Sequence, residues 1–136
     1  MTPLPVLEID GARFNDLEGF WDEVSRQLIP GAEWGRNLDA FNDILRGGFG
    51  TPEGGFVLRW TNSERSRVAL GYEVTVRWLE RKVERCHPDN VPSVRSDLEA
   101  ARAGHGPTLF DLLVEIIHVH GVGGDEAEDR VELRLE

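Results

Sequence analysis

A short amphipathic segment carries the first candidates for chemistry. Residues 38–46 contain four polar side chains at helical spacing, which are Asp39, Asn42, Asp43 and Arg46. In a helix these i, i+3, i+4 and i+7 positions share one face. Leu38, Phe41 and Leu45 repeat on the opposite face. The spacing therefore predicts a compact helix with one core face and one presented polar face.

The two carboxylates of this helix repel each other, since like charges at i and i+4 cost about 0.2–0.5 kcal/mol in an isolated helix. The preceding loop adds Glu33 and Trp34 beside the same stripe. Such a surface suits a cationic protein partner and could mimic an anion. The pair Asp39 and Asp43 could instead serve acid/base catalysis in a cleft, so this alternative stays open.

Other site chemistries are poorly supported by the residue spacing. The glycine-rich stretches 47–50 and 121–124 do not lead into Lys-Ser/Thr, so we expect turns rather than phosphate loops. Cys86-His87 and the pair His118 and His120 lack zinc-ligand spacing, and no Gly-x-Ser-x-Gly occurs. The sequence predicts no metal site, no cofactor and no nucleophilic enzyme.

Composition limits the class of protein. The chain has 136 residues, a 40% hydrophobic share and a net charge of -10, which fit one domain and disfavour direct nucleic-acid binding. The acidity lies at the two ends, because residues 59–102 carry nine basic and seven acidic side chains. A single cysteine, no apolar run of about 20 residues and no export signal predict a cytoplasmic protein without a membrane segment.

The periodicity of apolar residues predicts the helices and strands that position the polar face of residues 38–46. We expect strands at 6–9, 56–60 and 131–135 and helices over 16–28, 38–46, 62–106 and 109–121, with a break near Asp89-Asn90. Asn15 with Glu18, and Thr108 with Asp111, have capping-box spacing. The mostly apolar run 56–60 is typical of a strand buried on both faces. Strands separated by helices predict an α/β fold with a small three-stranded parallel sheet.

The stretch Glu-Trp-Gly-Arg-Asn-Leu-Asp-Ala-Phe-Asn-Asp at 33–43 resembles the loop and helix of barstar-type ribonuclease inhibitors. The resemblance covers roughly residues 4–65 and 107–136. It implies a compact α/β inhibitor with a three-stranded parallel sheet. It also implies a partner, a small basic guanyl-specific extracellular ribonuclease of microbes, bound 1:1 with its active-site cleft blocked so that the producing cell's RNA is spared.

The resemblance assigns roles by position. Asp43 resembles the central carboxylate that occupies the enzyme's phosphate site, and Asp39 resembles an acid near its guanine-recognition region. Further expected contacts are Gly35, Asn37 and Leu38, with Glu115 from the later helix and with Trp34 and Arg46 beside them. Glu33 and Asn42 stand where barstar has aromatic contact residues, which predicts a different cognate enzyme.

Residues from about 66 to 106 exceed the length of shorter relatives and are expected to form a helical insertion in a single domain over 1–136. Three alternatives remain open at this point. The chain could be an immunity protein of the same fold against a different nuclease toxin, a small carboxylate-dependent enzyme or a structural adaptor.

Overall fold

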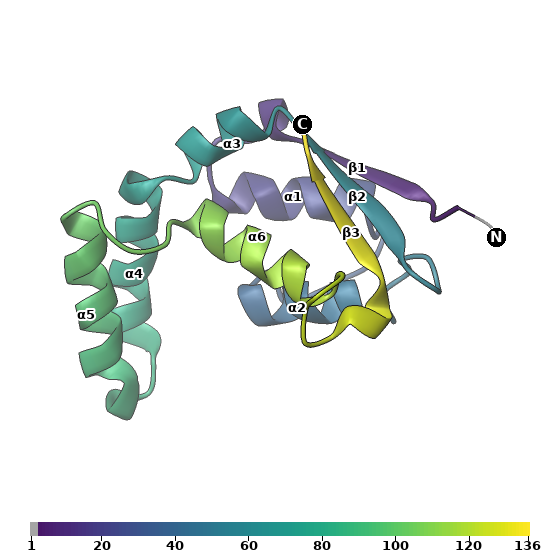
Figure 1. Cartoon of the computed structure of the whole chain (residues 1–136). Coiled ribbons are helices and arrows are strands. Elements are labelled where there is room, and N and C mark those ends of the chain that lie inside the picture. The colour runs from purple at the N-terminus through teal and green to yellow at the C-terminus, as the bar shows by residue number, and fades with distance from the viewer. Residues whose placement is uncertain (1–2) are drawn as a thin grey trace.

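The computed structural model describes residues 3–136 and has an α/β architecture (Figure 1). Its strands are β1 (Val6–Asp10), β2 (Phe56–Thr61) and β3 (Val131–Leu135), in the spatial order β1-β2-β3. Both strand pairs are parallel, so each connection crosses over through helices. The predicted three-stranded parallel sheet is therefore confirmed.

Helices cover one face of this sheet. The helices α1 (Leu17–Gln27) and α6 (Leu109–Val119) lie against it, α2 (Leu38–Arg46) packs beside α6, and α3 (Ser63–Ala69) crosses one end (Figure 1). The helices α4 (Tyr72–Arg85) and α5 (Val91–Arg102) form a hairpin that projects from the body. Short 3-10 turns complete the chain as η1 (Gly11–Arg13), η2 (Pro88–Asn90) and η3 (Ala127–Asp129). No helix among the described residues is long and apolar enough to cross a membrane.

Trp60 of the central strand lies at the middle of the main core. Its ring stacks on Phe20 with the centroids 5.2 Å apart and meets Phe110 edge-on at 5.1 Å. The indole Nε1 donates to Ser66 Oγ at 2.9 Å, so the ring is fully buried without leaving its N–H unpaired. This contact attaches α3 to the sheet.

The outer face of the sheet is open, which corrects the expectation that β2 is buried on both faces. Arg59 of β2 is exposed and pairs with Glu136 at 3.0 Å and with Glu8 at 3.8 Å. Val57 is 4% exposed and has Val6 and Glu132 as its partners in register. The run 56–60 is mostly apolar because Val57 is shielded by both neighbouring strands, while Arg59 reaches solvent. No helix of residues 3–136 covers the outer face (Figure 1).

Caps decide where the helices begin. Asp16, and not Asn15 as expected, caps α1, because its Oδ1 accepts from the Gly19 N–H at 2.8 Å. The capping box of α6 is confirmed. The Asp111 N–H donates to Thr108 Oγ1 at 3.2 Å, and the Thr108 N–H donates to Asp111 Oδ2 at 3.0 Å.

The α4–α5 hairpin has a small apolar cluster of its own. Its buried members are Leu79, Val94, Leu98 and Ala101. Trp78 packs against both this cluster and the main core. Residues 66–70 belong to the main body, since Leu70 is fully buried in the main core. The projecting part of the structure therefore begins near residue 71.

The separate cluster predicts that the hairpin can open without the sheet. Leu98→Ala removes buried apolar contacts, a change that costs about 2–5 kcal/mol in a protein core. We expect amides of α4 and α5 to lose hydrogen-exchange protection at least about 30-fold, while amides of β2 keep theirs. Leu113→Ala, in the main core, serves as the control and should weaken protection throughout. Equal loss in β2 with Leu98→Ala would contradict the prediction.

Candidate functional site

Local sequence determines the bounds of α2. Asn37 caps the helix, with its Oδ1 accepting from the Ala40 N–H at 2.7 Å. Asp39 lies in the first turn, where the helix dipole favours an acid. Gly47 ends the helix at a φ of 104°, a conformation that favours glycine. The predicted helix over 38–46 is confirmed with these bounds.

The polar stripe of α2 is largely presented to solvent. Asp39 and Asp43 are exposed, and the Asp43 side chain is 55% exposed. Asp43 Oδ1 accepts from Arg46 Nη1 at 3.0 Å. Within residues 3–136, Asp43 Oδ2 and both oxygens of Asp39 accept no hydrogen bond from a side chain or backbone group. The stripe therefore keeps free acceptor capacity for a cationic partner.

Asn42 does not share this exposure, which corrects its expected place on the presented stripe. Its Oδ1 lies 2.6 Å from His120 Nε2. The His120 side chain is fully buried, and its Nδ1 lies 2.7 Å from Asp129 Oδ2. A chain of hydrogen bonds thus joins α2 to the segment that precedes β3.

A second link runs parallel to the first on the solvent side. The Arg46 guanidinium donates to Glu126 through Nε at 2.8 Å and through Nη2 at 3.2 Å. These hydrogen bonds hold the pKa of the Glu126 carboxyl below its usual range and raise the pKa of Arg46. Arg46 therefore holds Asp43 on one side and the loop before β3 on the other.

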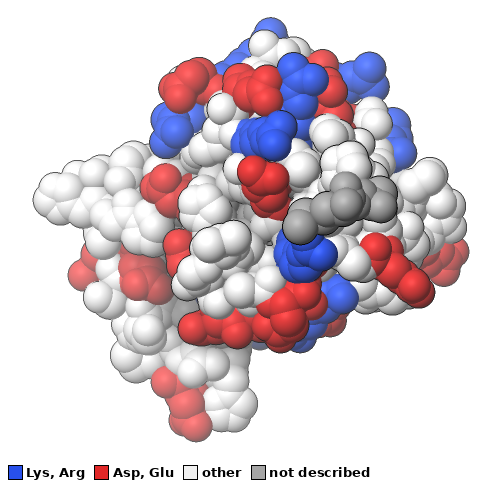
Figure 2. Space-filling view, turned by 45° about the vertical axis from the view of Figure 1, so that its right-hand side comes forward, with Lys and Arg blue, Asp and Glu red and all other residues white. Residues whose placement is uncertain are grey.

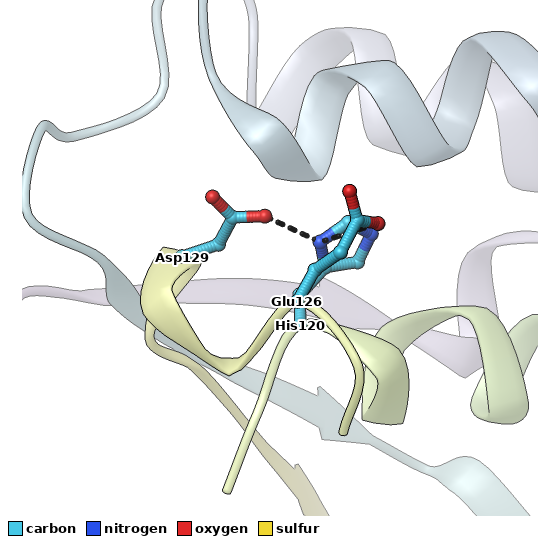
Figure 3. A group of neighbouring side chains, drawn as sticks. All are labelled: His120, Glu126 and Asp129. Carbon is cyan, nitrogen blue, oxygen red and sulfur yellow. Dashed lines mark hydrogen bonds and ion pairs between the residues drawn. The ribbon is translucent and has the colours of Figure 1, made fainter.

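Figure 3 shows His120, Glu126 and Asp129 converging between α6 and β3. Their donor atoms lie within 4.8 Å of one another, a spacing that could hold a metal ion. Each donor already has a protein partner, however, since Asp129 bonds His120 and Glu126 bonds Arg46. Together with Asn42 and Arg46, these three residues form a hydrogen-bonded brace that attaches α2 to the segment before β3. The sequence analysis missed this group because Asn42 and His120 are 78 residues apart.

The loop before α2 is attached to α1. Trp34 Nε1 donates to Ser25 Oγ at 2.8 Å, and its ring meets Trp21 edge-on at 5.3 Å. Arg36 Nη1 donates to Asp22 Oδ1 at 2.6 Å. Trp34 is half-buried, so the structure gives this aromatic residue a packing role. The loop is held rigidly next to the acidic stripe.

The remaining expected contact residues are divided between two helices and the loop. Glu33, Gly35 and Asn37 are exposed in or beside the loop, and Leu38 is half-buried against the main core. Glu115 is exposed on α6, which packs beside α2. Glu115 makes no ion pair in the described part of the chain. Their contacts with a partner stay a prediction.

A three-stranded parallel sheet with helices on one face and an exposed acidic helix defines a barstar-like class of small α/β protein. The sequence model of the family described as Barstar (barnase inhibitor) matches residues 4–101, and the chain belongs to this family. A comparison with curated proteins gives no match. The matched range includes α2 and ends before α6, so Glu115 lies outside it.

The buried link predicts a stability effect at His120. His120→Ala leaves Asp129 and Asn42 without their partner, and a buried polar group without a hydrogen bond costs about 1–3 kcal/mol. We expect the free energy of unfolding to fall by about 2 kcal/mol or more, measured by urea denaturation. His118→Ala, at an exposed position of α6, is the control and should change it by less than about 0.5 kcal/mol. Similar values for both variants would contradict the bracing role.

The lowered pKa of Glu126 predicts a pH-dependent contribution. A carboxyl whose pKa is lower in the folded than in the unfolded protein stabilises the fold above its unfolded pKa, about 4.5, and this stabilisation is lost as the pH falls through the folded value. Glu126→Gln should therefore lower Tm at pH 7. The difference from wild type should shrink as the pH falls below about 4.5, as followed by circular dichroism. A constant Tm difference across this range would exclude the charge as its cause.

Proposed function

We propose that this protein binds and blocks the active site of a small, basic, secreted, guanyl-specific ribonuclease with 1:1 stoichiometry. The single observation that carries the proposal is the exposed, braced α2 of a barstar-family chain, with Asp43 at its centre. The inhibitor would act in the cytoplasm of the bacterium that produces the enzyme and protect the cell's own RNA.

Free acceptor atoms support phosphate mimicry by α2. A ribonuclease cleft binds substrate phosphates with cationic and N–H groups, and carboxylates form the same charge-assisted hydrogen bonds. Asp39 and the free oxygen of Asp43 can accept such bonds without breaking an internal contact other than the exposed pair with Arg46. Arg46 has Glu126 as a second partner, so it stays neutralised when Asp43 turns to the enzyme.

The charge of the molecule favours encounter with a basic enzyme. The net charge is -10. On the face drawn in Figure 2, most basic side chains gather over the end formed by η1 and α3, and acidic side chains predominate below. Long-range attraction of this kind raises association rates and is weakened by salt. We therefore expect fast, salt-sensitive inhibition.

One observation favours an immunity protein against a different nuclease as the second candidate. Asn42 stands where the resemblance places an aromatic contact, and its side chain is turned toward His120. The exposed Glu33 replaces the other aromatic contact. Recognition would then depend on Asp39, Asp43 and the loop, which suits a nuclease other than barnase. A catalytic role is disfavoured by the solvent-exposed carboxylate of Asp43.

We also propose that residues 1–136 form a single barstar-like domain with a helical insertion. Two observations support this organisation. The α4–α5 hairpin packs around its own apolar cluster, and α3 and α6 on either side of it pack directly on the main core. The Phe110 N–H donates to the Leu70 carbonyl at 3.2 Å, which brings the two ends of the hairpin together.

The test is a titration of RNA cleavage by barnase and a panel of other bacterial and fungal guanyl-specific ribonucleases. Wild-type protein should inhibit at least one enzyme stoichiometrically. Asp43→Ala removes hydrogen bonds to charged groups, each contributing about 1.5–3 kcal/mol, so we expect inhibition to weaken at least about 100-fold.

The control for this variant is Asp97→Ala on α5, an exposed acid outside the acidic stripe with the same charge change. It should inhibit like wild type. Equal weakening by both variants would mean that overall charge, and not the position of Asp43, determines binding. If wild-type protein inhibits no nuclease of the panel, the ribonuclease assignment fails.

A further inference from the structure

A groove of about 930 Å³ separates α4 from the first turns of α1 and α2. Trp21, Leu38 and Trp78 are the apolar side chains among its lining residues, together with Leu17, Val74 and Leu109. Asn37 and Asp39 also line it, so the groove is continuous with the acidic stripe of α2. A partner seated on α2 would therefore meet the α4 wall as well.

The α4 wall is mainly basic, although the protein as a whole is acidic, and its one lining carboxylate in the described chain, Glu80, is paired with Arg102 at 3.3 Å. Arg77, Arg81 and Arg85 are four residues apart and lie in one row along the helix, with Lys82 beside them. Lys82 Nζ lies 4.9 Å from the centroid of the Trp78 ring. Arg77 pairs weakly with Glu73 at 3.9 Å, but Arg81, Lys82 and Arg85 have no ion-pair partner among residues 3–136. The helix dipole favours Lys82 and Arg85 in the last turn but not Arg77 and Arg81.

The facing wall is acidic. Asp16, Glu18 and Asp39 line the groove from the beginnings of α1 and α2. Among the described residues, Arg36 is the one cation on this side, and it is already paired with Asp22 at 2.6 Å. No ion pair joins the three acids to the α4 cations in the described part of the chain. The two walls of the groove therefore carry opposite charge and do not pair with each other. Each wall has unpaired charged groups that a partner protein could bind.

Contacts at the base of the hairpin keep the walls apart. Thr75 Oγ1 accepts from the Leu109 N–H at 2.9 Å and donates to the Gly71 carbonyl at 2.7 Å. Tyr72 donates its hydroxyl to the Gly106 carbonyl at 2.6 Å. Trp78 packs on both apolar clusters at once. These contacts attach α4 to α6 and oppose closure of the groove onto α2.

We propose that α4 is a second contact surface for the same nuclease, and that its cations bind an acidic rim beside the basic cleft that receives α2. This inference rests on the proposed function and deepens it. A partner that fits both walls must carry a basic cleft and neighbouring carboxylates. The hairpin then selects among basic nucleases, because one that lacks the acidic rim meets the α4 cations with like charge.

The test compares Arg81→Glu with Arg95→Glu, using the enzyme that wild type inhibits most tightly in the panel of barnase and other guanyl-specific ribonucleases. Both residues are exposed arginines of the same hairpin without an ion pair in the described structure, and only Arg81 lines the groove. Both variants make the inhibitor more acidic by two charges. A purely global charge effect would therefore tighten binding of a basic enzyme equally in both.

We expect Arg81→Glu to raise the inhibition constant at least tenfold at low salt, with a smaller effect at high salt, and Arg95→Glu to change it less than twofold. Equal inhibition by both variants would overturn the proposal. Tighter binding by Arg81→Glu alone would also overturn it and would indicate that α4 folds over Asp39 in the free protein.

Asp43→Ala, measured in parallel, separates this inference from the function on which it rests. Loss of inhibition by Asp43→Ala with full inhibition by Arg81→Glu would reject only the α4 contact. A panel that wild type leaves fully active would reject both. In the bound enzyme complex, hydrogen exchange should also slow at amides of α4 and not at those of α5, and an unchanged α4 would count against the proposal.

Discussion

The place of α2 in the molecule depends on one buried hydrogen-bond chain, from Asn42 through His120 to Asp129. Apolar burial of Phe41, Ile44 and Leu45 attaches the helix to the core but is non-directional. The two bonds of His120 add direction, because both ring nitrogens face an oxygen at less than 3 Å. They determine how the exposed face of α2 is turned toward solvent.

The carboxylates of this face are therefore held before any partner arrives. Arg46 reaches from Asp43 to Glu126 and links the stripe to the loop before β3. Trp34 and Arg36 attach the preceding loop to α1. A surface ordered in this way loses little conformational entropy on binding, which is how a small interface reaches useful affinity. The groove beside it extends the ordered surface onto α4.

Much of the fold was predictable because its signals are local. The parallel sheet follows from the alternation of strands and helices, and the bounds of α2 follow from Asn37, the apolar spacing and Gly47. The burial of β2 was mispredicted, since a central strand of a one-sided sheet can be as apolar as one covered on both faces. The capping residue of α1 is Asp16, one residue after the expected Asn15, because the Asp16 side chain reaches the Gly19 N–H.

The sequence by itself determined the fold class, the helix that carries Asp39 and Asp43, and the acidic character of the chain, because these depend on neighbours within a few residues. Only the tertiary structure decided that Asn42 turns inward, that His120 is buried against it and that α4 faces α2 across a groove. The partners in these contacts lie tens of residues apart in the sequence. Local spacing does not encode which distant side chains meet when the chain folds.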